Sequence, residues 1–79
     1  MLWHMDATEK YGYRIALGRT IRHYRVAQGL SLRALALMIG IYYAHLSNIE
    51  HGKVGATIDT IYKISEGLGV ELRDLFTSD

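Results

Sequence analysis

The sequence contains no cysteine and no proline, and it has only one tryptophan and one phenylalanine. Without cysteine, the chain can form neither a disulfide framework nor a thiolate metal site. The first ten residues, MLWHMDATEK, have neither the basic flank nor the long apolar run of a signal peptide. No apolar run approaches the ~20 residues of a membrane span. These absences favour a cytoplasmic protein that does not contact a membrane.

Motifs of enzymes and metal sites are also missing. The four histidines are scattered, and no HExxH motif, paired-carboxylate pattern or phosphate-binding loop accompanies them. His45 and His51 stand at positions that point to different faces of a helix, which is poor for holding a metal. We therefore expect a protein that is not an enzyme and has no metal, no cofactor and no evident small-molecule ligand.

The charged residues are divided unevenly along the chain. From Glu50 onward acidic residues outnumber basic ones, whereas no acidic residue stands between Lys10 and Ile49. The charged residues of that first part are Lys10, Arg14, Arg19, Arg22, Arg25 and Arg33. This division is typical of a protein that presents one face to phosphates. A solvated basic helix face would give the same pattern.

The pattern of apolar residues predicts helices throughout and no strand. The chain has 79 residues, of which 49% are hydrophobic, and this is enough for a single domain with a compact core. We expect a first helix from about residue 7 or 8 to Gln28, with Asp6 as its N-cap. Its buried face is predicted to hold Ile15, Leu17, Ile21 and Tyr24, and its outer face to hold Arg14, Arg19, Arg22 and His23.

Shorter helices are predicted at about 32–39, 43–50 and 58–67. Their expected capping and terminating residues are Ser31, Thr57, Gly40 and Gly69. A short fifth helix would contain Val70, Leu72, Leu75 and Phe76. The sequence therefore predicts a compact five-helix all-α domain over residues 7–79, preceded by a flexible segment at residues 1–6.

The helices at 32–39 and 43–50, joined by a glycine turn, have the pattern of a helix-turn-helix unit. This stretch resembles the lambda-repressor-like, Xre-type family of bacterial and phage regulators, with similarity over roughly residues 15–76. The residues that carry the resemblance are Gly29-Leu30-Ser31, Leu35-Ala36, Gly40-Ile41, Leu46-Ser47 and Ile49-Glu50-His51-Gly52-Lys53. In this family, the second helix of the motif, here at about 43–50, enters the major groove of double-stranded DNA.

The resemblance also implies which residues contact DNA. Leu46 and Ile49 are expected to face inward, and the outward positions that match the base contacts of the family are Tyr43, Ala44, Ser47 and Asn48. Asn48 is the strongest candidate, because an asparagine amide can pair with adenine through two hydrogen bonds. The expected phosphate contacts are Arg22, Arg33, Tyr42, His51 and Lys53.

Two further expectations follow from the resemblance. Arg25 and Glu50 match positions that form a partly buried structural ion pair in lambda-type repressors. A single short reading helix predicts a homodimer on a palindromic operator, with half-site centres ~34 Å apart. The candidate dimer contacts are Trp3, Leu72, Leu75 and Phe76, and each of them could instead complete the core of the monomer.

The sequence departs from the family on the side that would face DNA. Tyr42 replaces the usual serine or threonine N-cap, Leu32 replaces a glutamine, and Leu37 and Met38 occupy positions that are usually polar. One interpretation is a DNA reader of thymine-rich or unusual sequence. The alternative is a degenerate helix-turn-helix that binds protein through Leu32, Leu37, Tyr42 and Tyr43, as an anti-repressor or antitoxin subunit. The basic first half of the chain favours DNA.

Overall fold

The computed structural model describes residues 11–76, and every regular element in that part of the chain is a helix. The four α-helices are α1 (Gly12–Ala27), α2 (Leu32–Ile39), α3 (Tyr43–Glu50) and α4 (Ile58–Leu68). A short 3₁₀ helix, η1 (Leu72–Leu75), follows them. The predicted all-α class is confirmed. The predicted short fifth helix lies at the expected place, but it is a four-residue 3₁₀ helix, so the described residues form four α-helices.

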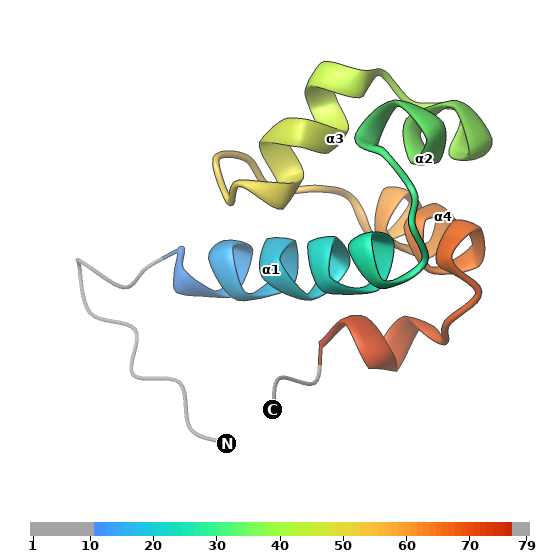
Figure 1. The fold of residues 1–79 in the computed structure, drawn as a ribbon. Coiled ribbons are helices and arrows are strands. Elements are labelled where there is room, and N and C mark those ends of the chain that lie inside the picture. The colour runs from blue at the N-terminus through green and yellow to red at the C-terminus, as the bar shows by residue number, and fades with distance from the viewer. Residues whose placement is uncertain (1–10, 77–79) are drawn as a thin grey trace.

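The helices enclose one core to which each of them contributes. In Figure 1, α2 and α3 lie above α1, and η1 lies below it. The packed pairs include α1 with α3, α2 with α3 and with α4, and α4 with η1. The buried apolar residues at the centre are Ile21, Leu35, Ala36, Leu46, Ile49, Ile61, Ile64, Leu68 and Leu75. No helix in the described part of the chain is long and apolar enough to cross a membrane.

Local chemistry sets the ends of α2 and α4 as predicted. The hydroxyl of Ser31 accepts a hydrogen bond from the Ala34 amide at 3.0 Å, and the Thr57 hydroxyl caps α4 in the same way. Gly40 ends α2 with φ of +72°, a conformation that disfavours residues with a Cβ. The N-cap position of α3 differs, because Tyr42 has the extended backbone of a cap but makes no capping hydrogen bond.

The predicted start of α1 is wrong. The helix begins at Gly12, after Tyr11, and no side chain caps it; Asp6, Trp3 and the segment 1–6 lie outside the described residues. Ile15 is 47% exposed instead of buried. The main chain of Gly52, in the loop after α3, lies against Ile15, and a glycine has no side chain to cover it further.

Candidate nucleic-acid interface

The orientation of α3 is fixed by its buried side. Leu46, Ile49 and Glu50 are buried against the rest of the bundle. Positions 43, 44, 47 and 48 consequently share the outer face of the helix, since residues one turn apart lie one above the other. Tyr43 and Ala44 are exposed there, while Ser47 and Asn48 are partly covered. The structure therefore brings together the four residues that we expected to contact bases: Tyr43, Ala44, Ser47 and Asn48.

The N-terminal end of this face carries a cation–π contact between two helices. Arg33 extends from the first turn of α2, and its Cζ atom lies 4.5 Å from the centre of the Tyr43 ring. The sequence places Arg33 among the phosphate contacts and Tyr43 among the base contacts, and nothing in the sequence indicates that they touch. Tyr42 lies at the same end of α3 and is 87% exposed.

The C-terminal end carries His51 and Lys53. Gly52 takes a φ of +70°, which turns the chain back so that the Lys53 amide donates to the Asn48 carbonyl at 2.9 Å. The Nδ1 atom of His51 lies 2.7 Å from the carbonyl oxygen of Ser47. A carbonyl only accepts, so Nδ1 is the donor. Expected phosphate contacts therefore stand at both ends of the expected base-reading face.

Arg22 lies on α1, outside the helix-turn-helix. It is exposed, and it lines an open hollow together with Arg19, His23, Val26 and Ala27. All of these residues belong to α1, so the hollow contains no residue of the helix-turn-helix. The phosphate contact expected for Arg22 stays a prediction.

The ion pair between Arg25 and Glu50 attaches the C-terminal end of α3 to α1. Nε of Arg25 donates to Oε2 of Glu50 at 2.7 Å, and Nη2 donates to Oε1 at 3.0 Å. Nη1 of Arg25 also donates to the Leu30 carbonyl at 2.8 Å. Arg25 is 8% exposed and Glu50 6% exposed. The hydrogen bond that Arg25 donates to Glu50 raises the pKa of Arg25, against the opposing effect of burial. One guanidinium thus joins α1, the loop after it and the last residue of α3.

An apolar surface borders the turn between α2 and α3. Leu37 is 85% exposed, and Met38 and Tyr42 are also exposed. Leu32 is different, because it is partly buried and packs against the core. The apolar patch that we considered as a protein-binding alternative is therefore smaller than expected from the sequence, since Leu32 does not contribute to it.

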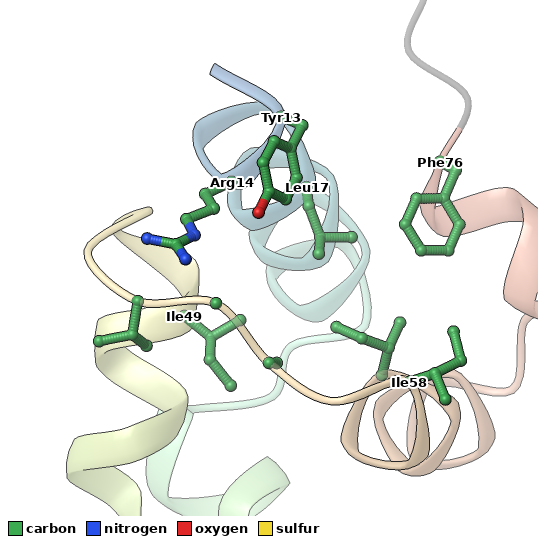
Figure 2. A pocket seen from close by; sticks show the side chains of 10 residues that line it. Tyr13, Arg14, Leu17, Ile49, Ile58 and Phe76 are labelled. Atoms are coloured by element: carbon green, nitrogen blue, oxygen red, sulfur yellow. The ribbon is translucent and has the colours of Figure 1, made fainter. Parts of the chain in front are cut away.

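A second apolar surface surrounds a pocket of about 190 Å³ between α1, the loop after α3 and α4. Figure 2 shows Tyr13 at one side of the pocket and Phe76 and Ile58 at the other. All three side chains are exposed. The sequence did not identify this pocket, because its walls come from segments distant in the chain. Leu75, an expected dimer contact, is 1% exposed and belongs to the core, and Leu72 packs against that core.

The only charged side chain lining this pocket is that of Arg14. Its guanidinium lies 4.1 Å from the centre of the Tyr11 ring. Arg14 was expected on the outer face of the first helix, but it is partly buried. Within the described residues, no group of three or more histidine, aspartate or glutamate side chains is placed to hold a metal ion.

Comparison with known proteins identifies the family of this fold. Residues 21–75 match the model of the helix-turn-helix family HTH_3. The chain is 33% identical over 63 residues to the control protein C.BamHI of Bacillus amyloliquefaciens, covering 78% of each chain. It is 38% identical over 64 residues to the HTH-type transcriptional regulator SlrR of Bacillus subtilis (strain 168). That match covers 80% of this chain but only 42% of SlrR.

Solved structures agree with the sequence matches. The restriction-modification controller protein C.AhdI from Aeromonas hydrophila superposes with a TM-score of 0.82 at 30% identity, covering 84% of this chain and 100% of that one. An HTH_3 family transcriptional regulator from Vibrio cholerae gives a TM-score of 0.79 at 32% identity, covering 84% of this chain and 37% of that one. The chain therefore belongs to the HTH_3 helix-turn-helix family of lambda-repressor-like, Xre-type transcriptional regulators.

Proposed function

We propose that this protein is a cytoplasmic regulator that binds a specific double-stranded DNA sequence by inserting α3 in the major groove. The observation that carries the proposal is the arrangement of the outer face of α3. Candidate base-reading residues occupy its middle, with Arg33 and Tyr42 at one end and His51 and Lys53 at the other. Contacts to phosphates on both sides of a reading helix fix its position along the groove.

The chemistry of each residue suggests its role. The amide of Asn48 suits an adenine, to which it can donate and from which it can accept a hydrogen bond. Ala44 offers only a methyl group, which suits the methyl of a thymine. Arg33, Tyr42, His51 and Lys53 would hold phosphates, which adds affinity without sequence information. Arg22, which lines a hollow formed by α1 alone, stays a predicted phosphate contact outside this set.

The protein would act as a homodimer on a palindromic operator. An eight-residue reading helix contacts few base pairs, and two copies on half-sites ~34 Å apart double the contacts. The exposed Tyr13, Ile58 and Phe76 around the apolar pocket supply a surface that a second copy would cover. We keep Phe76 as a dimer contact and exclude Leu75, which is buried. Trp3 remains a candidate that lies outside the described residues.

Selection from a pool of random duplexes tests the proposal, followed by a salt titration on the enriched sequence. Enrichment of a palindrome whose affinity falls steeply with salt is the expected result. Asn48→Ala should relax the preference at one base pair of each half-site. Lys53→Ala should instead weaken binding to all sequences alike and reduce the salt dependence by about one phosphate contact.

A protein-binding role is the second candidate function. The observation in its favour is the exposure of Leu37, Met38 and Tyr42 beside the helix-turn-helix. Exposed apolar side chains that lie together often mark a surface for a protein partner. If no DNA sequence is enriched and binding stays weak at low salt, this role as an anti-repressor or antitoxin subunit takes precedence.

A further inference from the structure

The contact between Arg33 and Tyr43 suggests a role for Arg33 that its charge alone would not indicate. We propose that Arg33, held against the ring of Tyr43, reads a guanine in the operator and so helps to determine specificity. This inference rests on the proposed DNA-binding function. It moves Arg33 from the phosphate contacts to the base contacts, and it makes Tyr43 a positioning residue for Arg33.

The stacked arrangement suits a base contact better than a phosphate contact. An arginine side chain is long and flexible, and holding its plane on an aromatic ring reduces the freedom it must lose on binding. A phosphate can also accept two hydrogen bonds from a guanidinium, but its oxygens can be approached from several directions, so the plane need not be fixed in advance. The O6 and N7 atoms of guanine lie at one base edge and require two parallel donors in that plane. The 4.5 Å contact with Tyr43 therefore prepares the geometry that guanine needs.

The donors of Arg33 are free to make this contact. Among the described residues, the ion pairs are Arg25 with Glu50 and Arg73 with Glu71, so Arg33 belongs to neither. None of the hydrogen bonds in the described region uses its guanidinium either. Arg33 is exposed, and its ring partner Tyr43 is the first residue of α3. The guanidinium thus lies at the N-terminal end of α3, and its N–H groups can donate to a base.

The placement also predicts where the guanine lies in each half-site. Tyr43 and Asn48 stand five positions apart on α3, which corresponds to about 7.5 Å along the helix axis. Successive base pairs are about 3.4 Å apart. The guanine read by Arg33 should therefore lie about two base pairs from the adenine that Asn48 reads.

Selection with four proteins tests the inference: the wild type, Arg33→Lys, Tyr43→Phe and Tyr43→Leu. Lysine can also donate to guanine but lacks the planar pair of donors, so Arg33→Lys should weaken the preference for guanine by about tenfold. Its affinity for random DNA and its salt dependence should stay within about twofold of the wild type. Tyr43→Phe keeps the ring and should keep the preference. Tyr43→Leu removes the ring and should lose the preference to a similar extent as Arg33→Lys.

The outcomes separate this inference from the function on which it rests. If the wild type enriches a palindrome and Arg33→Lys retains every base preference, the planar two-donor contact is not made and the inference is wrong, while the proposed function stands. A loss of preference in Tyr43→Phe equal to that in Tyr43→Leu would overturn the role of the ring. If the wild type enriches no sequence, both proposals fail. Because Arg33 and Tyr43 are exposed, thermal melting of the variants should match the wild type.

Discussion

Gly18 of α1 lies directly against the main chain of Glu50 at the end of α3. A Cβ atom at position 18 would overlap the carbonyl oxygen of Glu50 and would lie 2.6 Å from that of Ile49. A glycine at position 18 therefore permits a close contact between α1 and α3. The obstacle is main chain on the α3 side, so no side-chain rotation can relieve it. The distance between α1 and α3 depends on the absence of a side chain at position 18.

Gly18→Ala should destabilise the fold although alanine favours a helix by ~1 kcal/mol over glycine. Forcing an extra methyl into a packed contact costs about 1–3 kcal/mol. Since each kcal/mol shifts the melting temperature of a domain of this size by about 4–8 °C, calorimetry or circular dichroism would detect the change.

Gly12→Ala is the matched control for this substitution. Gly12 is also in α1, but apart from its own helix and its chain neighbours, no atom in the described part of the protein lies within 4 Å of the position that its Cβ would take. Gly12→Ala should be neutral or slightly stabilising. Equal melting temperatures for Gly18→Ala and Gly12→Ala would show that α1 and α3 can move apart to admit a methyl group without a loss of stability.

Removing one partner of the Arg25–Glu50 pair should damage the protein severely. Glu50→Ala leaves a buried guanidinium without its carboxylate, which typically costs about 3–5 kcal/mol. Domains of this kind are stable by only about 5–15 kcal/mol in total. We expect the melting temperature to fall by more than about 10 °C.

The exposed pair Arg73–Glu71 offers a comparison. Its side chains are largely in solvent, so Arg73→Ala should cost less than about 1 kcal/mol. If Glu50→Ala melts at the wild-type temperature, the buried pair contributes nothing to the stability of the fold.

The features of the fold that depend on local chemistry were predictable from the sequence. Ser31 and Thr57 cap the helices that follow them, and Gly40 ends α2, because each of these effects involves neighbouring residues. The start of α1 was predicted wrongly from Asp6, because a residue that can cap a helix does not by itself show where the helix begins. The burial of Leu75 and the exposure of Phe76 could not be separated, since both are apolar and adjacent.

For the candidate site, the sequence predicted only which side of α3 each residue occupies. The spacing of Leu46 and Ile49 gave the buried face and hence the outer one. The contact of Arg33 with Tyr43 depends on the angle between α2 and α3 and on two side-chain conformations, which no local pattern records. The pocket beside Tyr13 and Phe76 likewise joins residues from opposite ends of the chain.

Tyr42→Ser should stabilise the protein and weaken its binding to DNA. Tyr42 has an extended backbone at the N-cap of α3, with φ of −68° and ψ of 139°, but no side-chain cap. A serine there would supply the missing acceptor, a gain of about 1 kcal/mol. The same substitution removes the exposed phenol that we assign to a phosphate.

Thermal melting and DNA titration of Tyr42→Ser would separate these two effects. Ser31→Ala is the reciprocal control, because Ser31 already caps α2 and its loss should cost about 1 kcal/mol. A lower melting temperature for Tyr42→Ser would mean that the tyrosine packs in a way that outweighs the cap.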